Sequence, residues 1–125
     1  MPHPAEHDSA SRVLSAAEAG EIAETLKALG SAPRLRLLIE MMEGERTVEE
    51  LARAAGLEPS ATSHHLRILR TLRLARVRRS GRHAHYALHD HHIGELLAAV
   101  RHHHEHLYPP PAAELESPPR AGAAP

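Results

Sequence analysis

The spacing of apolar residues changes abruptly near residue 75, and this change limits the folds open to the chain. Up to residue 72, apolar side chains recur with the period of a helix, whereas residues 75–79 and 84–88 alternate as strands do. Ser80, Gly81 and Arg82 supply a turn between the two alternating segments. We therefore expect a β-hairpin that directly follows a series of helices.

Capping residues divide the chain upstream of the hairpin into four short helices. Two are expected to begin with capping boxes, in which a Ser or Thr is followed three residues later by Glu. The third and fourth are joined by a tight turn at Gly56, which is typical of a helix-turn-helix. A fifth helix is expected to start at Asp90. The sequence thus predicts a mainly α fold with a β-hairpin wing, a winged helix-turn-helix of five helices, in which the first four have the N-caps Ser15, Ser31, Thr47 and Ser60.

The expected domain spans residues 15–107, with a flexible arm at 1–14 and a disordered Pro/Ala-rich tail at 108–125. Among its 125 residues there is no Phe or Trp, so the core is small and a homodimer that buries more apolar surface is favoured. No apolar run approaches the roughly 18 residues of a membrane span. Since the first residues also lack a signal-peptide core, we expect a cytoplasmic protein without a membrane partner.

A long basic segment contrasts with the near-neutral charge of the whole chain. Residues 59–89 contain seven arginines and no Asp or Glu, although the net charge is −1. An arginine-rich segment of this kind is either a solvated surface or a nucleic-acid footprint. Its position over the helix-turn-helix and wing favours double-stranded DNA as the partner.

Four potential metal ligands lie on the last helix in the pattern D-x-H…H-x-x-H. Asp90 and His92 precede His103 and His106, and the absence of cysteine leaves only imidazole and carboxylate ligands. His92 and His103 are about three turns apart on one helical face, or roughly 16 Å along the axis. One ion cannot bridge that distance, so a shared site requires an antiparallel second copy and a two-fold dimer. Asp90 is also a favoured N-cap, and capping is the alternative role for its carboxylate.

Several segments resemble the ArsR/SmtB family of winged-helix metalloregulators. Residues 26–38 resemble the entry into the family's second helix, 60–69 its recognition helix, and Gly81-Arg82 before Tyr86 its wing. The resemblance covers about residues 15–107. It implies a sensory site shared between protomers, with Asp90 and His92 from one copy and His103 and His106 from the other.

The departures from the family pattern bear on the choice of metal. The family's thiolate site for arsenic, cadmium or lead is excluded, because the helix before the recognition helix has no cysteine. His3 and His7 resemble the additional histidines of nickel and cobalt sensors in the family. Zn(II) is therefore the first expectation for the divalent metal and Ni(II) or Co(II) the alternative, with the N-terminal histidines as possible extra ligands.

Short hydroxyl groups and basic residues identify the expected DNA contacts. Hydroxyls near a helix N-terminus can bind phosphates, while Thr, His and Arg can reach base edges in the major groove. Wing arginines are expected to contact the backbone or the minor groove. A dimer would place its recognition helices about 34 Å apart, which suits an inverted repeat. The expected contacts are Ser60, Thr62, Ser63, His64, Arg67, Arg78, Arg79 and Arg82.

These features together predict a repressor that binds its operator as an apo dimer and dissociates when the metal binds. A winged-helix regulator without metal control and a His-rich metal-storage protein are the alternatives. No nucleophile, general base or H-E-x-x-H motif is visible, so an enzyme with a small organic substrate is not expected.

Overall fold

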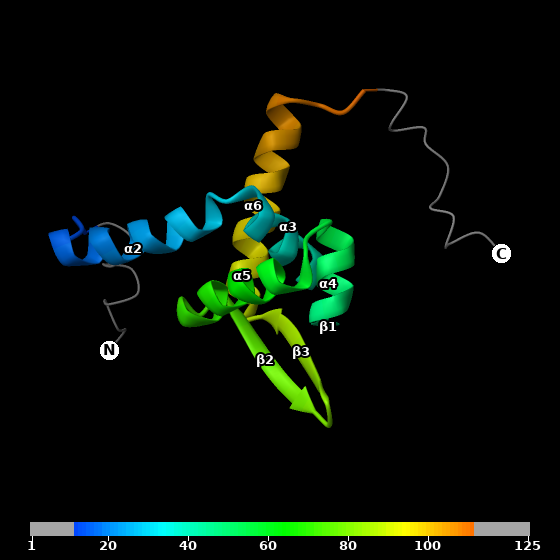
Figure 1. The fold of residues 1–125 in the computed structure, drawn as a ribbon. Coiled ribbons are helices and arrows are strands. Elements are labelled where there is room, and N and C mark those ends of the chain that lie inside the picture. Colours follow the sequence, from blue (N-terminus) through cyan, green and yellow to red (C-terminus); the bar gives the residue numbers. More distant parts are fainter. Residues whose placement is uncertain (1–11, 112–125) are drawn as a thin grey trace, which may run out of the picture. The chain divides into compact units, whose positions relative to one another are not determined.

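The computed structural model describes residues 12–111 and contains five helices and three strands in that part of the chain. It divides into two units, of which the first ends at His89 and the second begins at Asp90. The winged helix-turn-helix predicted from the sequence is confirmed within the first unit (Figure 1). In chain order the elements of this unit are α2 (Ala16–Leu29), α3 (Ala32–Met41), β1 (Arg46–Thr47), α4 (Val48–Ala55), α5 (Pro59–Thr71), β2 (Ala75–Ser80) and β3 (His83–Leu88).

The helix boundaries follow the caps that the sequence contains. Ser15 and Thr47 form the two predicted capping boxes, in which the carboxylates of Glu18 and Glu50 accept hydrogen bonds from the backbone N–H groups of the two cap residues. Gly56 ends α4 with φ of 67°, a left-handed conformation that glycine adopts without a steric penalty. The turn to α5 is therefore short, and α4 and α5 form the helix-turn-helix.

The wing is a two-stranded hairpin extended by one short strand. β2 and β3 pair antiparallel from Ala75–Leu88 to Ser80–His83, and Gly81 has a positive φ of 62° in the connecting turn. β1 pairs with β3 through Arg46–Tyr86 and Thr47–His85, giving the strand order β1-β3-β2. This added strand attaches the base of the wing to the start of α4.

The core of the first unit is built from leucine side chains of the helices. Six leucines are at most 2% exposed, so the helix-turn-helix rests on a small but closed aliphatic core. They come from α3, α4, α5 and the residue before β2, and they are Leu37, Leu38, Leu51, Leu66, Leu69 and Leu74.

The second unit consists of one helix, α6 (His91–Leu107), and the residues that follow it to 111. Asp90 is the N-cap of this helix, so the predicted helix start is confirmed. No helix within residues 12–111 is long and apolar enough to span a membrane.

Candidate metal centre and nucleic-acid interface

Asp90 is the N-cap of α6, and its side chain is already engaged there. Its backbone is extended (φ −154°, ψ 176°), and Oδ1 accepts a hydrogen bond of 3.2 Å from the backbone N–H of Ile93. The capping role considered from the sequence is thus confirmed. A capping carboxylate has a restricted orientation, so the helix start sets the direction in which Asp90 offers its oxygens.

The carboxylate of Asp90 lies beside the imidazole of His92. Nδ1 of His92 is 3.6 Å from Oδ1 of Asp90, and the two side chains are 73% and 40% exposed. The adjacent ring of His91 lies 4.1 Å from that of His92, centroid to centroid, and reaches Glu95 at 4.0 Å. One oxygen and one nitrogen donor are therefore close together and open to solvent at the start of α6.

His103 and His106 lie near the other end of α6, where both are exposed. Eleven residues separate His92 from His103, which corresponds to about 16 Å of helix at 1.5 Å per residue. Accordingly, no group of three or more His, Cys, Asp or Glu side chains that could hold a metal occurs in the described part of this single chain. The structure brings Asp90 and His92 together but does not bring them to His103 and His106.

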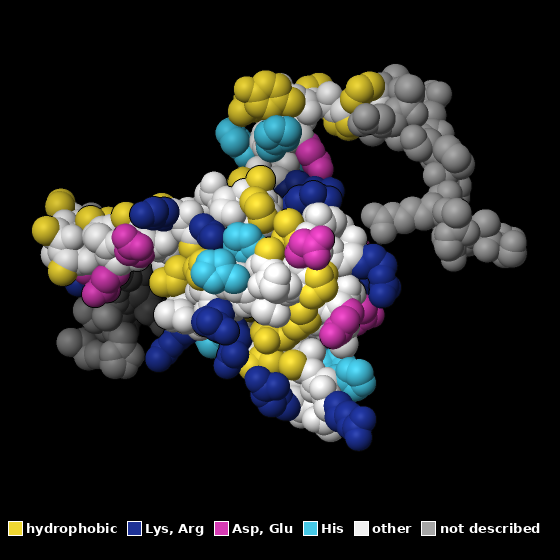
Figure 2. All heavy atoms as spheres, in the orientation of Figure 1, with side chains coloured by type: hydrophobic (Ala, Val, Ile, Leu, Met, Phe, Trp, Pro, Cys, Tyr) yellow, Lys and Arg dark blue, Asp and Glu magenta, His cyan; other side chains and the backbone are white. Residues whose placement is uncertain are grey.

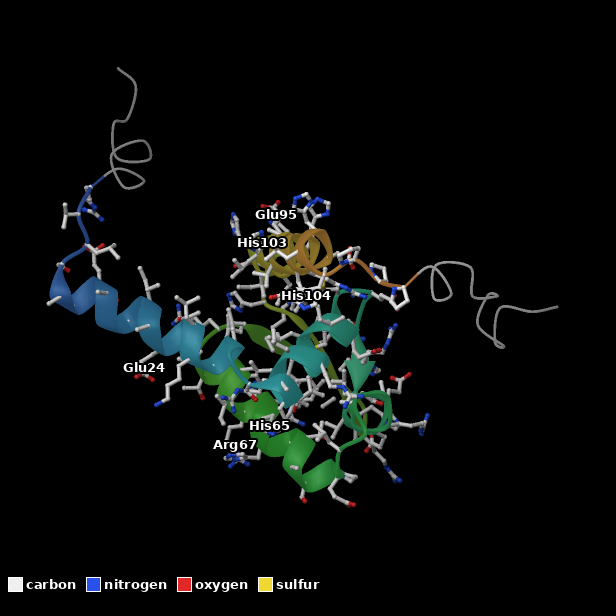
Figure 3. The ribbon with its side chains drawn as sticks, turned by 90° about the horizontal axis from the view of Figure 1, so that it is seen from above. Glu24, His65, Arg67, Glu95, His103 and His104 are labelled. Atoms are coloured by element: carbon white, nitrogen blue, oxygen red, sulfur yellow. The ribbon has the colours of Figure 1, made fainter. Side chains whose placement is uncertain are left out.

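The other histidines of α6 have different surroundings. The ring of His104 packs on that of Tyr108 at 5.0 Å, and Figure 3 shows His103 and His104 leaving the helix in different directions. The N-terminal candidates His3 and His7 lie outside the residues that the structure describes.

The recognition helix α5 presents a polar face and buries an apolar one. Ser60, Ser63, His64 and Arg67 are exposed, as a DNA contact requires. Leu66 and Leu69 on the opposite side are fully buried and fix the helix to the core. Figure 3 shows Arg67 projecting from α5. The sequence correctly separated the two faces for these residues.

Two details predicted for the start of α5 are wrong. Thr62 is 0% exposed, and its hydroxyl donates to the backbone carbonyl of Glu58 at 2.9 Å, so it cannot reach a base. Ser60 is not the N-cap; α5 starts at Pro59 with Glu58 as the cap residue and without a side-chain cap hydrogen bond. Proline suits the first helical position because its missing N–H has no partner there.

The wing carries four exposed arginines, namely Arg76, Arg78, Arg79 and Arg82. Basic side chains gather over α5 and the wing on the face drawn in Figure 2. Arg78 donates three hydrogen bonds of 2.8–3.1 Å to Glu45. Within residues 12–111, no salt bridge involves Arg79 or Arg82. Of the three predicted wing contacts, Arg78 is thus paired with Glu45, whereas Arg79 and Arg82 are exposed and form no salt bridge within residues 12–111.

A polar contact also joins α3 to the recognition helix, and no local sequence pattern predicts it. Arg34 donates from Nε to the carbonyl of Ala28 at 2.9 Å, and its Nη1 lies 3.4 Å from Nδ1 of His65. Burial, together with the nearby charge of Arg34, holds the pKa of His65 below its ordinary value. A neutral His65 can accept from Arg34, so the contact links the end of α2, the start of α3 and α5.

Comparison with known proteins agrees with this architecture. Residues 31–77 match the family model described as "Bacterial regulatory protein, arsR family". The chain is 42% identical over 95 residues to the HTH-type transcriptional regulator NmtR of Mycobacterium tuberculosis, covering 76% of this chain and 79% of that protein. This identity over most of both chains is sufficient to establish a common family.

Two solved structures share the fold. One is the homodimeric winged helix-turn-helix DNA-binding domain of a possible ArsR-family regulator from Mycobacterium bovis, with TM-score 0.68, 33% identity and coverage of 74% of this chain and 86% of that one. The other is the antimony-specific transcriptional repressor AntR, with TM-score 0.69, 33% identity and coverage of 77% and 87%.

Proposed function

Because this chain belongs to the ArsR family of bacterial regulatory proteins, we propose that it is a metal-responsive transcriptional repressor that binds operator DNA as a homodimer. The observation that carries the proposal is the presence on one chain of an exposed basic recognition helix and of an Asp90–His92 donor pair 3.6 Å apart. The members of this family are regulators, and the proposed partner is double-stranded DNA in the cytoplasm.

The DNA-binding role rests on the exposed face of α5 and on the wing. Ser60 and Ser63 can donate to phosphates near the helix N-terminus, and His64 and Arg67 can reach base edges in the major groove. Arg79 and Arg82 can bind the backbone beside that groove. Because residues 59–89 contain no acidic side chain, nothing within this segment repels phosphate.

A homodimer is supported by apolar side chains that each unit leaves exposed. On α2, Ile22 and Leu26 are 45% and 55% exposed, and on α6, Val100 and Leu107 are 56% and 55% exposed. Large exposed apolar groups at helical spacing are typical of association surfaces. The similarity to a homodimeric DNA-binding domain supports the same assembly.

The donor set suits a divalent transition metal. Asp90 and His92 of one copy, with His103 and His106 of the other, offer one oxygen and three nitrogen donors and no thiolate. A bound ion would supply bonds between two copies of α6. The antimony specificity named for one relative is not proposed here, because imidazole and carboxylate ligands suit zinc, nickel or cobalt.

Regulation requires that binding of the metal ion and binding of operator DNA be coupled through the dimer. If metal binding favours a dimer whose recognition helices no longer match successive grooves, DNA must lower metal affinity by the same factor. Protons compete for the ligands, because imidazole binds metal only when it is neutral. Acid is therefore expected to weaken sensing.

The decisive experiment compares the wild type with His103→Ala/His106→Ala in operator binding, with and without Zn(II). We expect metal to release the wild type and to leave the double variant on DNA. His102→Ala/His104→Ala is the matched control, since it removes two histidines of the same helix outside the proposed ligand set, and it should respond like the wild type. Release of the ligand variant by metal would show that the site is assigned wrongly.

The same experiment separates the alternatives. DNA binding without any metal response would favour a regulator with another signal, and metal binding without DNA binding would favour storage.

Zn(II) is the first proposal for the effector and Ni(II) or Co(II) the alternative. The absorption spectrum of the cobalt(II) complex distinguishes them: a four-coordinate spectrum that is unchanged by deletion of residues 1–10 favours zinc. A six-coordinate spectrum lost on that deletion favours nickel or cobalt with His3 or His7 as ligands.

A further inference from the structure

Glu45 lies between α3 and β1 and binds two arginines of the wing. Its carboxylate accepts from Nε of Arg78 at 3.1 Å to both oxygens and from Nη2 of Arg78 at 2.8 Å. Nη1 of Arg76 is 3.8 Å away. The guanidinium of Arg78 thus meets the carboxylate through two of its nitrogens, the geometry in which arginine also binds phosphate.

The alternation of β2 explains why these two arginines share a partner. Arg76 and Arg78 are two residues apart, so they lie on one face of the hairpin, whereas Arg79 lies on the other. The hydrogen bonds from Arg78 lower the pKa of Glu45, so the carboxylate stays charged at neutral pH. Glu45 is therefore a permanent negative charge at the base of the predicted DNA-binding wing.

We propose that Glu45 is an internal competitor for DNA phosphate, which holds Arg78 and Arg76 and leaves Arg79 and Arg82 to make the wing contacts. The proposal rests on the DNA-binding function above and adds a residue that sets the strength of that binding. Each phosphate contact contributes about 0.9 to the slope of log affinity against log salt. Relative to binding at 1 M salt, one contact therefore strengthens binding at 0.1 M salt about eightfold.

This restraint has a consequence for regulation. The coupling between two ligands on one protein is typically about 5- to 150-fold. A wing that used every arginine would tighten DNA binding by a factor of similar size, and metal binding would then release less of the protein. Glu45 keeps the sequence-independent part of DNA affinity within the range that metal binding can overcome.

The experiment measures the salt dependence of binding to a mixed-sequence 30-bp duplex by fluorescence anisotropy. Glu45→Ala is expected to bind about eightfold more tightly at 0.1 M salt, with a slope steeper by about 0.9, or by about twice that if Arg76 is freed as well. Adding Arg78→Gln to Glu45→Ala should reduce the slope by about 0.9 again.

Glu43→Ala is the matched control, because it removes the same charge two residues away and also frees an arginine. Glu43 pairs at 3.6 Å with Arg46, which lies in β1 and not in the β2–β3 hairpin, so this variant should keep the wild-type slope. Equal slopes for the two single variants, or no effect of Arg78→Gln in the Glu45→Ala background, would overturn the role of Glu45. A wild-type chain without salt-dependent DNA binding would instead refute the proposed function, and with it this role.

The Nε–Hε NMR signal of Arg78 provides a test without DNA. It should move in Glu45→Ala and stay in place in Glu43→Ala, since only the first variant removes its acceptor. An unmoved signal in Glu45→Ala would overturn the proposal even if that variant bound DNA more tightly.

Discussion

Replacing Thr62 by valine tests whether this residue of the recognition helix has a structural role, unlike its exposed neighbours, which are proposed to bind DNA. The Thr62 hydroxyl donates to the carbonyl of Glu58 at 2.9 Å, and the backbone N–H of Thr62 donates to the same oxygen at 2.9 Å. Thr62→Val therefore removes one donor and leaves no acceptor without a partner. The side chain is 0% exposed, so the change lies wholly inside the core.

The expected effect on stability is small because two contributions oppose each other. A lost hydrogen bond costs about 0.5–1.5 kcal/mol, while the methyl group that replaces the hydroxyl gains about 0.8 kcal/mol by burial. The free energy of unfolding of Thr62→Val should thus stay within about 1 kcal/mol of the wild type. Thr62→Ala loses both groups and leaves a cavity, so we expect a loss of about 1–2 kcal/mol.

Two measurements test this reasoning at one fixed protomer concentration. Thermal unfolding followed by circular dichroism gives the stability, and a shift of 1 kcal/mol corresponds to about 4–8 °C for a domain of this size. Fluorescence anisotropy gives the DNA affinity, which Thr62→Val should leave unchanged. The exposed neighbour supplies the contrast: Ser63→Ala should keep the melting temperature and lower the DNA affinity several-fold. The burial argument would be refuted if Thr62→Val had normal stability but lost as much DNA affinity as Ser63→Ala.

Two further predictions concern the Asp90 helix cap and the half-buried His65. Asp90→Asn should keep the α6 cap but weaken cobalt(II) binding, whereas Asp90→Ala should also lower the helix stability by about 1 kcal/mol. Competition titration measures the metal affinity. If Asp90→Asn bound cobalt(II) as tightly as the wild type, Asp90 would act only as a helix cap. The lowered pKa of His65 means that the unfolded chain, with an ordinary value near 6.5, binds more protons than the folded one. The free energy of unfolding should therefore fall as pH drops below 6.5, and His65→Gln should make this fall smaller. Urea unfolding at pH 7.5 and 5.5 measures the change for each protein. An equal change in the wild type and in His65→Gln would contradict the prediction.

The fold was predictable where local chemistry decides it. The capping boxes at Ser15 and Thr47, the glycine at residue 56 and the alternation of the wing each encode an element within a few residues. β1 was missed because two residues are too few to show alternation. Arg73 follows α5 in a left-handed conformation with φ of 57°. A glycine is usual at such a helix end, so an arginine there does not predict this conformation.

The candidate site was only partly predictable, for a different reason. Spacing along α6 identifies residues that share a face, such as His92 and His103. By contrast, the Glu45–Arg78 pair joins residues 33 positions apart, and the Arg34–His65 contact joins residues 31 apart. Such pairs depend on how β1 and α3 pack against other elements, which no local pattern records. Thr62 was misplaced because a hydroxyl suits both a buried hydrogen bond and a phosphate contact.

The structure also constrains where metal sensitivity can arise. Asp90 and His92 are already 3.6 Å apart because the helix cap fixes one and the first turn carries the other, so this half of the proposed site costs little to assemble. His103 and His106 lie about three turns away, and in the proposed dimer they would complete the site of the other copy. Metal affinity then depends mainly on how two α6 helices align, a property of the dimer rather than of either chain. Substitutions at the exposed apolar residues of α6, far from any ligand, should therefore alter metal affinity and DNA release together.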